Sequence, residues 1–139
     1  MNSSKIVIVG ARYYPYVIVG EFFEYCEFFC KKQRYLILYN LKHYNIQVFH
    51  EGVKIEEVDQ TPEDQHLLNE YYYREEDIRA KAISCYSKSI TSKAKICMEI
   101  LENNLISFGI HSKKLSYEEI KNELRNMAEH PENYIKLYE

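Results

Sequence analysis

The stretch that most constrains this fold runs from Thr61 to Gly109, because no Gly or Pro interrupts it after Pro62. Thr is a favoured N-cap, Pro is favoured at the first helical position, and the two acids that follow would lie at the positive end of the helix dipole. We therefore expect a helix to begin at Pro62 and to end with Gly109 as its C′ residue. A helix of about forty residues is long for a small domain, so we also expect a kink or break between Arg74 and Asp77.

Short runs of β-branched and aromatic residues predict strands in the part of the chain before this helix. Three of these runs are Lys5–Gly10, Val17–Gly20 and Tyr35–Tyr39. The second run either pairs with the first or leads into the segment that follows it. A further run, Ile46–His50, is expected to form a hairpin with Val53–Ile55, in which Gly52 takes the positive φ of a tight turn.

A segment rich in phenylalanine follows the second run and has the spacing of a helix. Its charged residues recur at intervals of three, three and four: Glu21, Glu24, Glu27 and Lys31. Residues at these intervals share one face of a helix, and every residue between them is Phe, Tyr or Cys. We therefore expect a helix over about residues 20–33 that is buried on several sides.

The C-terminal part carries the signature of one more helix. Ser116 and Glu119 form a capping box, and Leu115 with Ile120 forms the hydrophobic staple that accompanies it. The buried stripe would be Ile120, Leu124 and Met127, and Pro131 would end the helix. Residues 134–138 alternate between apolar and polar, which predicts an edge strand.

Together these segments predict one α+β domain over residues 1–139. Its sheet would be small, mixed or antiparallel, with four or five strands, and would be joined by the buried Phe-rich helix and a C-terminal helical layer. Residues 1–60 would form the strand-rich part, and residues 61–139 the mainly helical part.

The composition indicates a soluble globular protein and excludes a disordered chain, with 46% hydrophobic and 28% charged residues. No apolar run approaches the ~20 residues that span a bilayer, and the start MNSSK lacks the basic and apolar regions of a signal peptide. The four cysteines are expected to be buried free thiols rather than metal ligands or disulfides, because only Cys26 and Cys30 come near the spacing of zinc ligands. We therefore expect a cytoplasmic protein with no membrane segment, metal or cofactor.

The charge of the chain is segregated. Between Ile78 and Met98 there is no acid, and the five cations of that window leave the rest of the chain at −8, because the whole chain carries −3. On a helix, one side of this window would be buried, and it comprises Ile83, Tyr86, Ile90, Ala94, Cys97 and Leu101. The opposite side would carry a basic, hydroxyl-rich row, which comprises Lys81, Ser84, Lys88, Thr91, Ser92 and Lys95.

This row could hold phosphates through charge and O–H donors, or it could meet an acidic protein surface. The alternative is a solvated helix face without a ligand. A sequence pI near 6.0 argues against nucleic acid as the partner.

Two aromatic clusters are further candidates for binding. In the loop Gly10–Tyr16, an arginine among tyrosines could clamp a phosphate and stack on a base, and its ligand residues would be Arg12, Tyr13, Tyr14 and Tyr16. A structural turn stiffened by Pro15 is the alternative. On the long helix, Tyr71, Tyr72 and Tyr73 point in three directions, so at least one of them should be exposed or lie at an interface.

Catalytic candidates are few. His66 and Glu70 lie one turn apart on a helix, and His50 stands beside Glu51, so either pair offers acid–base chemistry. Such pairs occur by chance in a chain with 5 His and 21 acids. The sequence contains neither the dinucleotide nor the Walker phosphate-binding motif, and it has no nucleophile elbow.

We therefore predict a small binding protein without catalytic activity, which forms a homodimer. It would recognise a protein partner or a phosphorylated small molecule through its Tyr-rich and Lys/Ser-rich surfaces, a description that fits accessory proteins of viruses and mobile elements. The alternative is a nucleotide-handling enzyme that uses the Gly10–Tyr16 loop with His50 or His66 as acid or base.

Overall fold

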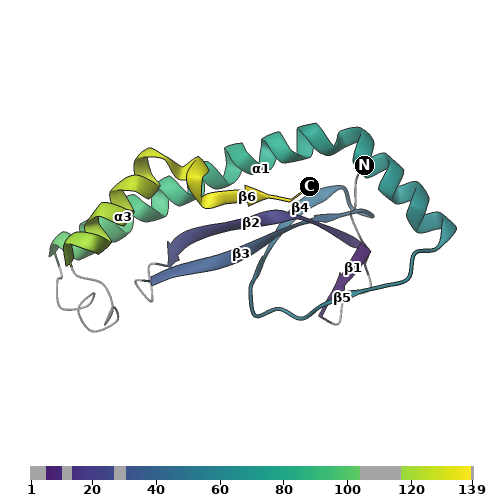
Figure 1. Ribbon diagram of the computed structural model, residues 1–139, viewed down its shortest axis with the longest axis horizontal. Helices are drawn as coiled ribbons and strands as arrows, with labels where there is room; N and C mark the ends of the chain where they lie inside the picture. Colours follow the sequence, from purple (N-terminus) through teal and green to yellow (C-terminus); the bar gives the residue numbers. More distant parts are fainter. Residues whose placement is uncertain (1–5, 11–13, 27–30, 104–116, 139) are drawn as a thin grey trace. The chain divides into compact units, whose positions relative to one another are not determined.

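The computed structural model describes residues 6–10, 14–26, 31–103 and 117–138 (Figure 1). Over these ranges the chain forms an open sheet of six strands and two α-helices, one of them long. The predicted α+β class is therefore confirmed. Within the same ranges, no helix has both the length and the apolar character needed to cross a membrane.

The sheet is antiparallel in its described pairings. Its strands are β1 (Ile6–Val9), β2 (Tyr16–Cys26), β3 (Lys31–Asn40), β4 (Asn45–His50), β5 (Ile55–Glu57) and β6 (Ile135–Leu137). Their order is β4-β3-β2-β1-β5, and β6, the strand expected near the C-terminus, pairs with β2. β1 lies antiparallel to β2, with Ile6 opposite Val17, so the second β-branched run pairs with the first.

The two short strands after β3 do not pair with each other. β4 is antiparallel to β3, with Asn45 opposite Asn40, and β5 is antiparallel to β1, with Ile55 opposite Val9. The hairpin predicted between residues 46–50 and 53–55 is therefore wrong, because these strands stand at opposite ends of the strand order.

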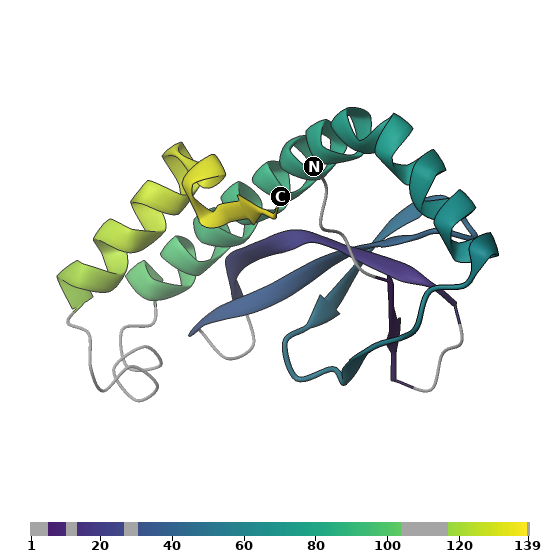
Figure 2. The same ribbon diagram turned by 45° about the vertical axis from the view of Figure 1, so that its right-hand side comes forward.

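The helix predicted over residues 20–33 is also wrong, because the described part of this segment lies in β2 and β3. Figures 1 and 2 show these two strands as long neighbours. A run that is apolar on all sides suits a strand buried on both faces as well as it suits a buried helix, and aromatic residues favour the strand. Phe22 and Tyr25 are buried, while Glu24 accepts a hydrogen bond of 2.7 Å from the Ser89 hydroxyl.

The residues group into two compact units. The first unit contains Met1–Glu21, Tyr35–Ile83 and Lys136–Glu139, and the second contains Phe22–Arg34 and Ser84–Ile135. The strands β2 and β3 and the helix α1 (Pro62–Asn103) contribute residues to both units. The single domain expected from the sequence stays a prediction.

In the first unit, the sheet is apolar on both faces. One face gathers Val7, Val9, Tyr16, Leu36 and Leu38, with Ile18, Phe49, Val53 and Ile55 packed against them. On the other face, the ring centroids of Tyr39 and Tyr71 lie 5.6 Å apart, which places α1 against β3. The side chains of α1 that are buried in this unit follow helical spacing and are Leu68, Tyr71, Ile78 and Ala82.

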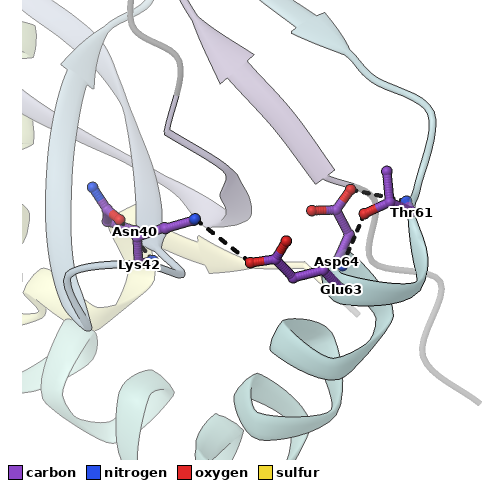
Figure 3. Close-up of polar contacts among 5 residues, drawn as sticks. All are labelled: Asn40, Lys42, Thr61, Glu63 and Asp64. Atoms are coloured by element: carbon purple, nitrogen blue, oxygen red, sulfur yellow. Dashed lines mark hydrogen bonds and ion pairs between the residues drawn. The ribbon is translucent and has the colours of Figure 1, made fainter.

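The start of α1 is capped as predicted (Figure 3). The backbone N–H of Asp64 donates to Thr61 Oγ1 at 3.2 Å, and the backbone N–H of Thr61 donates to Asp64 Oδ2 at 2.9 Å. This reciprocal pair is a capping box in which Asp takes the place of Glu. Lys42 Nζ lies 3.8 Å from Glu63 Oε1 in the same view, an exposed contact that adds little stability.

The turn between β3 and β4 depends on a buried asparagine. Asn40 is 1% exposed, and its Oδ1 accepts hydrogen bonds of 2.9 Å from the backbone N–H groups of Lys42 and His43. The backbone N–H of Tyr44 donates to the Asn40 carbonyl at 2.9 Å, and Tyr44 has a φ of 58°. Among the described residues, positive φ values occur at Tyr44 and Gly10, so the positive φ predicted at Gly52 is wrong.

α1 runs as one continuous helix, so a break between Arg74 and Asp77, one of the two alternatives expected there, is wrong, and the kink stays a prediction. This stretch reads Arg-Glu-Glu-Asp and contains no helix-breaking residue. The predicted helix end at Gly109 and the predicted cap at Leu115 and Ser116 lie outside the described residues.

The second unit combines the rest of α1 with α3 (Tyr117–Glu129) and the short 3-10 helix η1 (Pro131–Tyr134). Figures 1 and 2 show α3 beside this part of α1. The buried residues that the two helices contribute to this unit, among those described, are Ile90, Ala94, Cys97, Leu101, Ile120, Leu124 and Met127. The stripe predicted on α3 is confirmed, and so is most of the stripe predicted on α1, whose first member, Ile83, is instead 41% exposed.

The C-terminal strand comes very close to β2 at Gly20. A Cβ atom on Gly20 would lie 2.3 Å from the Lys136 carbonyl oxygen and 2.8 Å from the Leu137 Cα. Nearby, the backbone N–H of Tyr138 donates to the Val19 carbonyl at 2.8 Å. Both atoms that approach Gly20 belong to the backbone, so any side chain at this position would displace β6.

Gly20→Ala should therefore lower the free energy of unfolding by about 1–3 kcal/mol, the usual cost of overpacking, as measured by urea denaturation. Gly52→Ala is the matched control, because a Cβ atom there meets its nearest neighbour at 3.7 Å and no positive φ is involved. The control should be neutral or should stabilise by about 0.4–1 kcal/mol. Equal stability of the two variants would contradict the close approach of β6.

Candidate functional site

The three lysines of the basic, hydroxyl-rich row predicted on α1 are exposed, as expected, but the structure divides them between two hollows. Lys88 and Lys95 line a hollow of about 440 Å³ in the second unit. We call it the lysine–hydroxyl hollow, and its described lining is Ser87, Lys88, Thr91, Ser92, Lys95 and Pro131. Lys81 lines a different hollow in the first unit, and Ser84 is exposed but lines neither.

Helical spacing brings these side chains together. Positions 88, 91, 92 and 95 recur at intervals of three and four, so they share one face of α1. The opposite face is held by Ile90 and Ala94, both fully buried, which fixes the rotation of the helix. Thr91 Oγ1 donates to the Ala128 carbonyl at 3.1 Å and thereby joins this face to the end of α3, just before Pro131.

The lysine–hydroxyl hollow has a positive lining. It presents two ammonium groups and three hydroxyls, and its described lining includes no carboxylate. Neither Lys88 nor Lys95 forms an ion pair with a residue that the structure describes. An anion in this hollow would therefore meet unpaired ammonium groups and the O–H donors of Ser87 and Ser92, which is chemistry that suits a phosphate.

Among the described residues of this unit, the acid–base groups with shifted pKa values are phenols. Burial raises the pKa of Tyr86 from 10.0 to about 12, and its ring stacks on Phe22 at a centroid distance of 4.6 Å. Burial and the neighbouring Glu123 carboxylate raise the pKa of Tyr25 further still, and the Tyr25 hydroxyl donates to Glu123 Oε1 at 2.9 Å. Lys32 Nζ donates to the other carboxylate oxygen at 2.9 Å. These phenols stay neutral at pH 7 and hold the unit together rather than exchange protons.

The raised pKa of Tyr86 predicts a loss of stability at alkaline pH. An unfolded phenol loses its proton near pH ~10, whereas the folded one keeps it up to about pH 12. This contribution to stability is therefore complete below pH ~10 and is lost as the pH rises from there towards 12. The midpoint of thermal unfolding should fall across this window, and Tyr86→Phe should make the fall shallower. The same slope in the variant as in the parent would contradict this assignment.

The structure describes two of the four residues that the sequence proposes as ligand contacts in the loop after β1. Arg12 and Tyr13 lie outside the described residues. Tyr14 is 46% exposed, and its ring meets the His43 ring edge-on at a centroid distance of 4.6 Å. Tyr16 is fully buried in the core of the first unit, and its hydroxyl has no hydrogen-bond partner among the described residues.

The histidines proposed for acid–base work lie in the first unit. The backbone N–H of Gly52 donates to Nδ1 of His50 at 3.4 Å, and the His50 ring lies edge-on to Tyr35. His66 Nε2 lies 3.6 Å from Glu70 Oε1, one turn further along α1. Within the described ranges, no three side chains of His, Cys, Asp or Glu come together as a metal site would require.

The three consecutive tyrosines face three environments, as predicted. Tyr71 is 4% exposed and packs in the core, Tyr72 is partly buried, and Tyr73 is 92% exposed. Tyr73 borders the first-unit hollow that contains Lys81, which has a volume of about 590 Å³. We call it the arginine–tyrosine hollow, and its described lining is Tyr39, Tyr44, Ile46, Tyr73, Arg74, Asp77, Ile78 and Lys81.

Sequence reasoning missed most of this second hollow. Tyr39 and Tyr44 flank the turn between β3 and β4, far from Arg74 in the chain, and no local pattern links them to the helix. The signals available were Tyr73, because three adjacent tyrosines on a helix cannot all be buried, and Lys81, which belongs to the basic row predicted on the helix.

Comparison of the chain with protein-family models, with curated proteins and with solved structures finds no match in any of the three. The function must therefore be inferred from the geometry of the chain itself.

Proposed function

We propose that this chain is a small binding protein without catalytic activity, and that it holds a phosphorylated ligand in the lysine–hydroxyl hollow. The observation that carries this proposal is the gathering of Lys88, Lys95 and three hydroxyls around one hollow whose described lining includes no carboxylate. Solvated helix faces usually mix charges of both signs, and α1 does so before Ile78. A plain solvated helix face does not explain why the described lining of this hollow contains no acidic residue.

The spacing of the two lysines limits the size of the anion. Residues seven apart on a helix are separated by roughly 10 Å along its axis. Their long side chains can therefore converge on one phosphate or hold two phosphate groups at either end of the hollow. Two lysines without an arginine fall short of the charge that a nucleic-acid surface needs, so a small phosphorylated molecule fits better.

The absence of catalysis is part of the proposal. The phenols of Tyr25 and Tyr86 in the second unit are neutral at pH 7, and the candidate bases His50 and His66 belong to the first unit. A cytoplasmic location fits the described cysteines, Cys26, Cys85 and Cys97, none of which is part of a disulfide, although Cys85 is exposed rather than buried as expected. The homodimer stays a prediction from the sequence.

The experiment that tests this proposal compares ligands released from purified protein. The parent chain and the double variant Lys88→Glu/Lys95→Glu are purified from cells and denatured, and the released small molecules are identified by mass spectrometry. The parent should release a phosphorylated compound in stoichiometric amount, and the variant should release none, because its hollow repels anions.

A matched control separates this effect from general charge. Lys31 and Lys136 are exposed lysines that do not line the hollow, so Lys31→Glu/Lys136→Glu changes the net charge equally. Both double variants should keep the thermal midpoint of the parent within a few degrees. Release of the same compound from the Lys88/Lys95 variant would rule out this hollow as its site. If the parent releases nothing and gives no calorimetric signal with pyrophosphate, the proposal fails.

A further inference from the structure

The arginine–tyrosine hollow of the first unit differs in chemistry from the lysine–hydroxyl hollow. Two tyrosine rings, two isoleucines, two cations and one acid contribute to its lining, beside the buried Tyr39. Its volume of about 590 Å³ lies within the range of small-molecule sites. Aromatic and apolar walls with a few charged groups are typical of such sites, whereas a purely electrostatic surface would lack the rings.

Arg74 is held in position by aromatic neighbours. Its guanidinium carbon lies 5.4 Å from the centroid of the Tyr44 ring, within the range of a cation–π contact. The same guanidinium stands near the Tyr39 phenol, where it opposes the rise in the pKa of Tyr39 that burial causes. An arginine ordered in this way loses less side-chain entropy when it binds an anion, and its planar N–H groups can grip a phosphate or carboxylate in a bidentate manner.

Tyr44 is presented by a strained turn. Its φ of 58° is costly for a residue with a Cβ atom, and the turn is kept in place by the hydrogen bonds to Asn40. Tyr44 is 53% exposed as a residue and contributes to the lining of the hollow. Strain of this kind collects at binding sites, where the conformation that costs stability is the one that meets the ligand.

Tyr73 supplies a second exposed ring. It is 92% exposed, projects from α1 and lines the same hollow as Tyr44. It also borders a smaller hollow with His66, Asn69 and Glu70, so solvent surrounds it on both sides. A planar ring bound here would meet the faces or edges of two tyrosines and the apolar side chains of Ile46 and Ile78.

The charges limit the number of anionic groups on the ligand. Arg74 and Lys81 each contribute one positive charge and Asp77 one negative charge, which leaves the lining with a formal excess of one positive charge. None of the three forms an ion pair with a residue that the structure describes. Asp77 would repel the outer groups of a polyphosphate, whereas a single acidic group beside Arg74 leaves Asp77 free to accept a hydrogen bond from the ligand.

We infer that the arginine–tyrosine hollow binds a planar aromatic ring that carries one anionic group, as in a nucleoside monophosphate. The ring lies against Tyr73 and Tyr44, and the anionic group is bound by Arg74 with support from Lys81. This site is separate from the lysine–hydroxyl hollow and does not depend on the function proposed for it.

The first test uses three related probes in isothermal titration calorimetry with the full chain. Adenosine monophosphate carries ring and anion, adenosine carries the ring alone, and ribose 5-phosphate carries the anion alone. The monophosphate should bind about tenfold more tightly than either fragment, because base stacking and the charged contact each add to its affinity. Equal affinity for ribose 5-phosphate and the monophosphate would overturn the inference, as would the absence of binding by the monophosphate.

The second test locates the site with matched variants. Tyr73→Ala should weaken binding of the monophosphate about tenfold and leave ribose 5-phosphate unchanged. Arg74→Lys should weaken both, because lysine lacks the planar fork and does not stack on Tyr44. The controls Tyr117→Ala and Arg125→Lys alter exposed residues of α3 and should bind as the parent does. Unchanged affinity in the Tyr73 or Arg74 variant would overturn the inference.

A third variant separates binding from folding. Glycine adopts positive φ without strain, so Tyr44→Gly relieves the turn while it removes the ring. This variant should keep or raise the thermal midpoint and should still bind the monophosphate less tightly than the parent. Parent-like affinity in this stably folded variant would show that the Tyr44 ring does not contact the ligand and would overturn its assigned role.

Discussion

The burial of both faces of the central strands is the constraint on which the rest of this structure depends. Val17, Val19 and Ile37 are at most 1% exposed, and their neighbours Leu36 and Leu38 are buried on the opposite face. A strand that is apolar on both faces must be covered twice, and roughly 25 cal/mol per Å² is lost wherever cover is missing. In the first unit this cover comes from Phe49, Val53 and Ile55 on one face and from α1 on the other.

The length of α1 follows from this constraint. In the first unit the helix covers β3 through Tyr71, and in the second unit Tyr86 stacks on Phe22 of β2. Each unit therefore takes one segment of the helix into its core, and the stretch from Arg74 to Asp77 lies within the first segment. A break there would leave Ile78 and Ala82 without the helical register that buries them. The continuous helix thus serves packing, and its exposed side remains available for other roles.

That exposed side carries two kinds of chemistry. Around Arg74, the cations are accompanied by Asp77 and by tyrosine rings, whereas around Lys88 they are accompanied only by hydroxyls and Pro131 among the described residues. The first combination recognises shape as well as charge, and the second recognises mainly charge. The difference arises because the turn between β3 and β4 supplies Tyr39 and Tyr44 to the first hollow, whereas the described lining of the second hollow includes no such ring.

Local sequence determined the features that depend on short-range physics. The cap formed by Thr61, the apolar stripe of α3 and the exposed lysines of α1 were predicted, because each rests on residues close together in the chain. The pairing of the two β-branched runs was one of two alternatives that the sequence left open. The segment after Gly20 was predicted as a helix, which is wrong. An apolar run that is buried on all sides is compatible with the residue period of a helix and with that of a strand. Only the tertiary structure decided that it is strand, because strand pairing satisfies its backbone groups while cover on both faces buries its side chains.

In the same way, Lys88 and Lys95 could be placed on one face from helical spacing alone, but Pro131 joined their hollow only through the packing of α3. The arginine–tyrosine hollow was decided entirely by tertiary structure, because it brings together a helix face and a turn that no local pattern connects.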